Sequence, residues 1–182
     1  MGITKKKQLQ KQISTKQRII FGMFEMMMEK SYADITVKEI CERAELSRMT
    51  FYRNFHTKED VLLAQFEMVY NTFIQRLIVQ NRFTFYDVAT TFFTLINENK
   101  LMMEAIVKND LTNLLLRSLS ADIKKLIENQ ILITQESSSD LLVAMISGGL
   151  TEVIVTWTRD GMRQPVEELV IFASKYMHLK TS

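Results

Sequence analysis

Residues 36–58, TVKEICERAELSRMTFYRNFHTK, are the stretch that decides the fold of this chain. Thr36 and Glu39 form the T-x-x-E pattern of a capping box, in which each side chain accepts a hydrogen bond from a free backbone N–H at the start of a helix. The apolar residues that follow recur at i, i+3, i+4 and i+7, the spacing of one buried helical face. They are Val37, Ile40, Cys41 and Ala44.

Two further helix starts lie in or next to this stretch. Ser47 is suited to cap a second short helix, and Thr57, with Asp60 three residues later, is suited to cap a third. The first two helices are expected at about 37–44 and 48–53, with a tight turn between them. One helix that braces and a second that enters the major groove form a helix-turn-helix, the motif that reads DNA.

The same stretch resembles the DNA-binding domain of the tetracycline-repressor (TetR/AcrR) family of bacterial transcription regulators. The family pattern runs roughly T-V-x-x-I-A-x-x-A-G-V-S-x-x-T-(aliphatic or Phe)-Y-x-x-F-x-(S/T/N)-K-(E/D)-x-L, and the chain keeps its spacing. The matching residues are Thr36, Val37, Ile40, Ala44, Ser47, Thr50, Phe51, Tyr52, Phe55, Thr57, Lys58, Glu59 and Leu62. The resemblance implies an all-α protein with an N-terminal three-helix DNA-binding domain and a C-terminal helical ligand-binding and dimerisation domain.

Two residues depart from the family pattern. Cys41 replaces the usual alanine, which is a small-for-small change within a helix face. Glu45 replaces the turn glycine, so a residue with a Cβ is expected to adopt the left-handed backbone at a steric cost. Leu46 occupies the apolar position that follows, and we expect the turn to form with some strain.

The resemblance assigns DNA contacts to the second motif helix and its flanks. Arg48 and Thr50 face the groove at the start of that helix and are the expected base-edge contacts, since arginine reads guanine O6 and N7. Arg53 is suited to a base edge or a phosphate. Hydroxyl, imidazole and ammonium groups suit phosphate oxygens. The full set of candidate DNA contacts is Thr36, Ser47, Arg48, Met49, Thr50, Tyr52, Arg53, His56 and Lys58.

Composition agrees with a helical, folded protein. The 182 residues include one proline and five glycines, too few for a protein built from hairpins, and 47% are apolar. A single cysteine suits a reducing cytoplasm and excludes an internal disulfide. No membrane-spanning apolar run is expected, and the N-terminus is polar and lysine-rich without the apolar core of a signal peptide, so a cytoplasmic protein without a membrane partner is expected.

Charge is divided unevenly between the two parts of the chain. Residues 1–60 carry 12 Lys and Arg against 8 Asp and Glu, whereas residues 61–182 carry 11 against 13. The basic part is therefore the part expected to bind phosphate. We expect a basic tail at 1–13, a helix-turn-helix domain at 14–60 and a regulatory and dimerisation domain at 61–182. Lysines in the tail are suited either to DNA or to a solvated end.

Helical periodicity continues to the end of the chain. A first helix is expected from Ser14 to about Lys30, with Ile20, Met23, Phe24 and Met27 facing inward. Gly161 suits a helix end and Pro165 the first position of the last helix. The remaining helices are expected at 58–79, 84–98, 101–107, 110–134 (with a break near Ser120), 138–159 and 165–178.

The last two helices are the expected dimer contact. Two-fold pairing of these helices into a four-helix bundle is what the resemblance implies. Gly148 and Gly149 weaken an isolated helix by about 1 kcal/mol each, and their position inside one indicates close approach of another backbone. The alternative is packing against a neighbouring helix of the same chain. The expected interface comprises Gly148, Gly149, Val153, Leu169, Ala173 and Tyr176.

Large apolar residues of the middle helices are candidates for a small-molecule pocket or for ordinary core. Twelve methionines make such a core adaptable, since a thioether fits irregular volumes. No charged or polar cluster in this region indicates a ligand class. The candidates are Phe92, Phe93, Leu95, Ile96, Met102, Met103, Leu115, Met145 and Trp157.

Enzyme chemistry finds little support in the sequence. His56, His178 and Cys41 do not form a metal-binding spacing, and no glycine-rich phosphate loop is present. We therefore expect no catalysis, metal or cofactor. The expected function is a ligand-responsive repressor that binds a near-palindromic operator as a homodimer. The competing hypothesis is a co-activator of the same fold that works through another regulator. The operator, the effector and the sign of regulation do not follow from the sequence.

Overall fold

The computed structural model describes residues 14–80, 84–133, 139–176 and 180–181 of the chain. The expected basic tail at 1–13 and His178 lie outside the described residues. The chain divides into two compact units, Met1–Gln65 and Phe66–Ser182. The dividing point falls inside the helix that was expected to begin at Lys58, a few residues after the boundary expected at 60.

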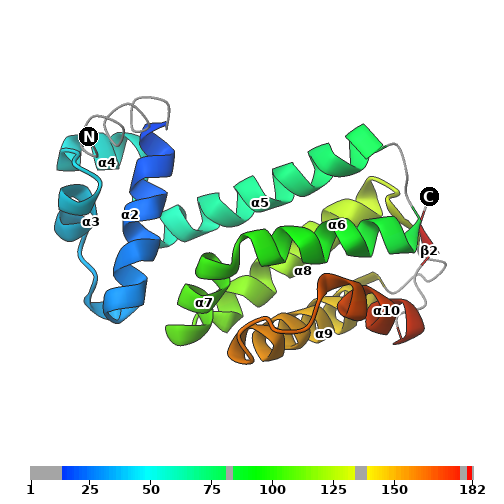
Figure 1. The fold of residues 1–182 in the computed structure, drawn as a ribbon. Helices are drawn as coiled ribbons and strands as arrows, with labels where there is room; N and C mark the ends of the chain where they lie inside the picture. The colour runs from blue at the N-terminus through cyan, green and yellow to red at the C-terminus, as the bar shows by residue number, and fades with distance from the viewer. Residues whose placement is uncertain (1–13, 81–83, 134–138, 177–179, 182) are drawn as a thin grey trace, which may run out of the picture. The chain divides into compact units, whose positions relative to one another are not determined.

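Unit 1 is a bundle of short helices around one apolar core. The inward face predicted for the first helix is buried, and it packs against α3, which packs against α4 (Figure 1). Phe51 of α4 is fully buried and Phe55, directly after α4, is 5% exposed. The elements are α2 (Thr15–Glu29), the 3-10 turn η1 (Tyr32–Asp34), α3 (Val37–Arg43), α4 (Arg48–Asn54) and the first part of α5 (Lys58–Gln80).

Unit 2 is a second helical bundle, in which α8 packs along α9 and α10 packs along α6 (Figure 1). A two-residue strand β1 pairs antiparallel with β2 near the end of the chain. The all-α fold class is confirmed. The elements after α5 are α6 (Phe85–Glu98), α7 (Lys100–Lys108), α8 (Thr112–Glu128), β1 (Leu132–Ile133), α9 (Ser139–Arg159), α10 (Val166–Tyr176) and β2 (Lys180–Thr181).

The expected helix at 110–134 is the one whose bounds are wrong. α8 ends at Glu128, and Gln130 then takes a φ of 58° while Ile131 N–H donates to Leu126 O at 2.9 Å. This pairing is a Schellman end, which normally uses glycine. α8 is also unbroken at Ser120, whose Oγ lies 2.9 Å from Leu116 O and 2.9 Å from Ser147 Oγ.

Smaller differences concern α9 and α10. Pro165 lies one residue before α10, and its carbonyl accepts from Glu168 N–H at 3.0 Å. Against expectation, α9 has a stretch, Asp140–Arg159, with the length and mean hydropathy (1.6) of a membrane span. The structure buries 44% of the apolar window in this stretch, and α9 packs against α7 and α8. Length and composition alone do not separate such a core helix from a membrane span.

Candidate DNA-reading surface and effector cavity

The turn between α3 and α4 has the left-handed backbone predicted at Glu45, the position where the family pattern has glycine. Glu45 has a φ of 54°, and the backbone closes a Schellman end in which Leu46 N–H donates to Cys41 O at 2.9 Å. Arg18 of α2 holds this turn through Nη2, which donates to Ala44 O at 2.6 Å and to Glu45 O at 3.2 Å. This contact joins residues 26 positions apart in sequence, so no local pattern indicated it.

Predicted caps fix the start of α4 and the start of α5. Ser47 Oγ accepts from Thr50 N–H at 3.1 Å and lies 2.9 Å from Thr50 Oγ1. Beyond the helix, Asp60 Oδ2 accepts from the backbone N–H groups of His56 and Thr57 at 2.9 and 2.8 Å. These hydrogen bonds lower the pKa of Asp60, most of all the one from the Thr57 backbone. The starts of α4 and of α5, on either side of a short loop, are thereby fixed by local hydrogen bonds.

One face of α4 is exposed and carries the predicted groups. Arg48, Met49, Tyr52 and Arg53 are exposed, with exposed fractions of 66% for Met49 and 52% for Tyr52. Phe51, on the opposite face, is fully buried, and its ring meets the Tyr52 ring edge-on with centroids 5.4 Å apart. α4 therefore has a buried anchor and an outward face of two guanidinium groups, a thioether and a phenol.

The basic side chains of unit 1 differ in whether a carboxylate of the same unit pairs with them. Arg43 forms two hydrogen bonds with the Glu29 carboxylate, at 2.9 and 2.6 Å. Lys30 contacts Glu39 at 2.6 Å, and this hydrogen bond is the main reason why the pKa of Glu39 falls to about 2. Within the described residues, Arg48 has no ion-pair partner. Arg53 contacts Met49 Sδ at 3.4 Å.

Lys58 has a structural role that the sequence did not indicate. Its Nζ donates to three backbone carbonyls, at 2.6 Å to Tyr32, 3.0 Å to Ala33 and 3.0 Å to Ile35. It also lies 4.4 Å from the centroid of the Tyr32 ring. All three ammonium protons are thereby used, and partial burial lowers the Lys58 pKa. The predicted phosphate contact does not fit this geometry, because no N–H is left for a phosphate oxygen.

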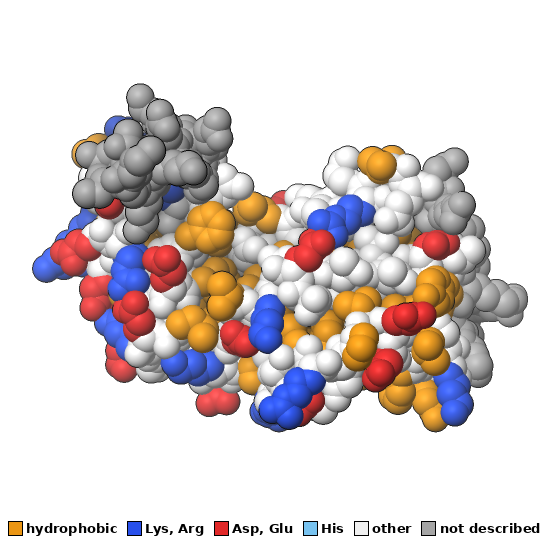
Figure 2. Space-filling view, viewed as in Figure 1, with side chains coloured by type: hydrophobic (Ala, Val, Ile, Leu, Met, Phe, Trp, Pro, Cys, Tyr) orange, Lys and Arg blue, Asp and Glu red, His pale blue; other side chains and the backbone are white. Residues whose placement is uncertain are grey.

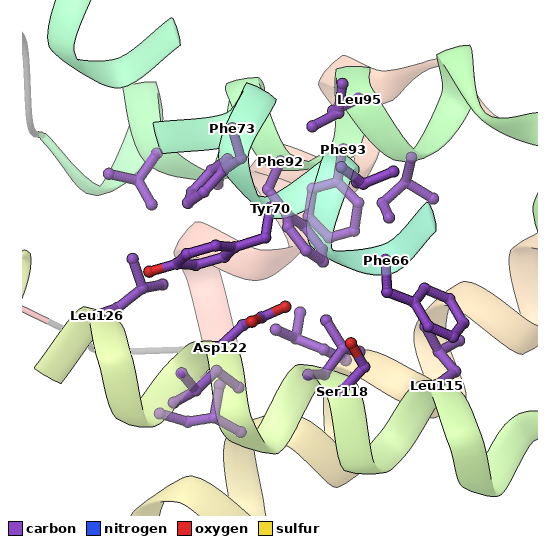
Figure 3. A pocket seen from close by; sticks show the side chains of 18 of the residues that line it. Phe66, Tyr70, Phe73, Phe92, Phe93, Leu95, Leu115, Ser118, Asp122 and Leu126 are labelled. Carbon is purple, nitrogen blue, oxygen red and sulfur yellow. The ribbon is translucent and has the colours of Figure 1, made fainter. Parts of the chain in front are cut away.

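Unit 2 contains a cavity of about 110 Å³, lined by side chains of α5, α6, α7, α8 and later segments. Phe66, Tyr70 and Phe73 of α5 form part of its wall (Figure 3), and they were not among the residues predicted to line a pocket. Asp122 and Ser118 of α8 are its polar lining residues besides Tyr70. Seven predicted residues line it: Phe92, Phe93, Leu95, Ile96, Met102, Met103 and Leu115.

Two predicted pocket residues do not line this cavity. Met145 is 67% exposed on α9, because its helical position points outward. Trp157 lies behind the wall: its ring meets Phe93 edge-on with centroids 6.3 Å apart, and Nε1 donates to Gln164 O at 3.1 Å. Trp157 instead contributes to a shallow groove between α9 and α10 that also includes Val153 and Leu169.

The outer face of α9 and α10 exposes large apolar side chains. Phe172 and Tyr176 of α10 are 50% and 61% exposed. Figure 2 shows hydrophobic side chains over this part of unit 2, with acidic side chains between them. A Cβ added at Gly148 or Gly149 would meet nothing within 4 Å, so close packing within the described part of the chain does not explain these glycines. Ala173 was placed on this face wrongly, since it is 3% exposed and lines the cavity.

Comparison with known proteins identifies both parts of the chain. Residues 19–64 match the profile described as bacterial regulatory proteins, tetR family. Residues 84–179, more than half of the chain, match the profile described as a transcriptional regulator C-terminal region. No curated protein matches the chain by sequence.

Solved structures share the fold at low sequence identity. Lin0861 from Listeria innocua is 17% identical with a TM-score of 0.76, over 88% of this chain and 87% of that one. A TetR transcriptional regulator from Streptococcus agalactiae is 20% identical with a TM-score of 0.61, over 94% and 96%. FadR from Bacillus subtilis, in complex with stearoyl-CoA, is 20% identical with a TM-score of 0.54, over 87% and 95%. These structures share the fold, and the two profiles show that the chain is a member of the tetR family of transcriptional regulators, with a DNA-binding domain at its N-terminus.

Proposed function

We propose that this regulator is ligand-responsive and binds a near-palindromic operator as a homodimer, with one α4 helix in each of two successive major grooves. The DNA-binding part of this proposal rests on the exposed face of α4, which carries Arg48, Met49, Tyr52 and Arg53. Arg48 is exposed in the first helical turn, the part of a recognition helix that reaches base edges, and no described carboxylate neutralises it. The two half-sites would lie about 34–36 Å apart.

Individual roles follow from where each side chain lies. Arg48 reads a base edge, with guanine as the favoured partner. Thr50 is half-buried, and its hydroxyl is hydrogen-bonded to Ser47 Oγ. Its methyl group and any further hydrogen bond of that hydroxyl are therefore its proposed contacts with DNA. Arg53 and Tyr52, both exposed, are proposed to contact a base edge or phosphates. His56, exposed directly after α4, is a proposed phosphate contact. The Thr36 hydroxyl already donates to Glu39 Oε2 at 2.7 Å, so the phosphate contact predicted for Thr36 does not fit this geometry.

The α9–α10 outer face is the proposed dimer interface. Gly148 and Gly149 leave space on α9 for a helix of a second copy, since nothing in the described chain fills it. Val153, Leu169 and Tyr176 belong to the same surface, and the exposed Met145 extends it toward the start of α9. Burial of such an apolar face is the main driving force for stable association.

The cavity of unit 2 is the proposed effector site. Phe66, Tyr70 and Phe73 line it from α5, and the same helix begins in unit 1 at Lys58. An effector that moved the α5 wall would act on a helix shared by both units. Such coupling between two sites is typically worth about 1–3 kcal/mol. A DNA-binding regulator of this kind is expected in the cytoplasm, where its operator is.

Fluorescence anisotropy with promoter DNA from the gene neighbourhood tests the DNA-binding proposal. Wild type should bind, and Arg48→Ala should bind its operator roughly 5- to 150-fold more weakly, the equivalent of about 1–3 kcal/mol for a lost bidentate contact. Arg163→Ala is the charge-matched control, since Arg163 is an exposed arginine of unit 2. If folded wild type binds no DNA at any salt concentration, the co-activator hypothesis replaces this proposal.

A further inference from the structure

An acidic side chain lies in the wall of an otherwise apolar cavity. Figure 3 shows the Asp122 carboxylate of α8 directed into the cavity between Tyr70 and Ser118. Its neighbours in the wall are mainly phenyl, leucine, isoleucine and methionine side chains. Asp122 interrupts the apolar face of α8 between Leu119 and Leu126, which also line the cavity. This interruption is the sequence signal that marks the residue.

One described cation, Lys125, pairs with the Asp122 carboxylate. Lys125, one helical turn later, donates to Oδ1 at 3.0 Å and lies 4.5 Å from the centroid of the Tyr70 ring. The Lys125 side chain is 48% exposed whereas that of Asp122 is 18% exposed, so the ammonium faces solvent and the carboxylate faces inward. Lys125 is the one described residue that hydrogen-bonds this carboxylate.

The environment of Asp122 is unfavourable to an isolated negative charge. Desolvation by burial raises the Asp122 pKa, and the hydrogen bond from Lys125 opposes that rise. A carboxylate in an apolar wall lacks the water that would solvate it, which has a free-energy cost unless another donor meets it. A ligand with a positive or strongly donating group would supply that donor, whereas an anionic ligand would be repelled.

The size of the cavity limits the rest of the ligand. Its volume of about 110 Å³ is comparable to an engineered protein cavity of about 150 Å³ that binds benzene. A single aromatic ring or a short branched chain is therefore the body that fits without enlarging the site. Phe66, Tyr70 and Phe93 offer aromatic surface to such a body.

From this geometry we infer that the cavity selects a small apolar molecule bearing an amine, whose ammonium group binds Asp122. The inference rests on the proposed function in one respect, namely that the cavity of unit 2 is the effector site. Lys125 then shares the carboxylate with the ligand, since one carboxylate accepts several hydrogen bonds. The simpler alternative is an i, i+3 surface pair between Asp122 and Lys125 that stabilises α8 and has no ligand role.

Three probes of nearly the same shape separate these readings: benzylamine, benzyl alcohol and benzoate, measured by isothermal titration calorimetry on full-length wild type. Benzylamine should bind roughly tenfold or more tightly than benzyl alcohol, and benzoate should bind most weakly, because charge-assisted hydrogen bonds are the stronger class. Equal affinities, tighter binding of benzoate, or no binding of benzylamine would overturn the inference. This comparison needs no variant, so it stands whether or not a substitution folds.

Asp122→Asn is the matching variant, because it keeps the shape and removes the charge. It should lose roughly tenfold in benzylamine affinity and leave benzyl alcohol binding unchanged. Asp140→Asn is the control, since Asp140 is an exposed aspartate that also pairs with a lysine, Lys124, at 2.8 Å. If Asp122→Asn keeps the benzylamine preference, the carboxylate is not the recognition group and the inference fails.

Failure of this inference is distinguishable from failure of the proposed function. Anisotropy titrations of operator DNA without any probe test the regulator itself. A wild type that binds DNA but discriminates none of the three probes overturns the amine inference alone. A wild type that binds benzylamine through Asp122 but no DNA overturns the regulator proposal and leaves the cavity assignment in place.

Discussion

Replacing Lys58 by methionine removes an ammonium group while keeping a side chain of similar length. Three charge-assisted hydrogen bonds disappear, at 2.6, 3.0 and 3.0 Å, together with the contact to the Tyr32 ring. A hydrogen bond to a charged group contributes about 1.5–3 kcal/mol. Tyr32 and Ala33 are not buried, so water can replace the lysine at their carbonyls, whereas Ile35 is 2% exposed.

Because water can replace the lysine at two of the three carbonyls, we expect the free energy of unfolding to fall by about 2–3 kcal/mol in total. Urea denaturation followed by circular dichroism should show the midpoint lowered by roughly 1 M or more. Lys38→Met is the control, because Lys38 makes only an exposed i, i+4 pair with Glu42 at 3.7 Å, worth at most about 0.5 kcal/mol.

The DNA-binding consequence separates this structural role from a phosphate contact. The dependence of log K on log salt should keep its slope in Lys58→Met when binding is measured well below the unfolding transition. A lysine that neutralises a phosphate contributes about one unit to that slope. A variant with unchanged stability and a slope reduced by about one unit would refute the structural role and restore the phosphate contact predicted from sequence.

Three further predictions concern other parts of the chain. Gly149→Leu should weaken or abolish the dimer by filling the open space on α9, and a variant that stays dimeric in analytical ultracentrifugation at low micromolar concentration would remove this helix from the interface. Glu45→Gly should stabilise the protein by up to about 1 kcal/mol in urea denaturation, because relief of the left-handed strain at φ 54° exceeds the added entropy of the unfolded chain; a lower midpoint would contradict this. The Glu39 pKa is lowered from 4.5 to about 2, chiefly by Lys30, so its stabilising effect is present above pH 4.5 and is lost as the pH falls toward 2. Glu39→Gln should therefore differ from wild type in thermal melts at neutral pH and converge with it near pH 2, and a constant difference across that range would argue against the Lys30 pair.

Helix starts were predictable from sequence because the forces that fix them are local. Ser14, Thr36, Ser47 and Thr57 each accept the backbone hydrogen bond that their position three residues before the donor implied. A cap involves side chains and backbone within one helical turn, so short patterns carry the information. The family pattern then added the order of the helices and the strained turn at Glu45.

Helix ends, and contacts between distant residues, were less predictable. α8 ends in a Schellman motif at Gln130, where the usual glycine signal is missing. The roles of Lys58 and Arg18 depend on carbonyls more than 20 residues away in sequence. The cavity combines side chains from several helices, so helical spacing within α6 found part of its wall and could not indicate the α5 residues opposite.

Binding-site selection from random double-stranded DNA, with wild type and Arg48→Ala in parallel, tests the central claim most directly. Wild type should enrich a near-palindrome whose half-site centres are about 10–10.5 base pairs, or a multiple, apart. Arg48→Ala should keep that spacing while losing preference at one base pair in each half-site, with guanine as the expected wild-type choice. Enrichment of no sequence by folded wild type, or an unchanged motif in Arg48→Ala, would contradict the account.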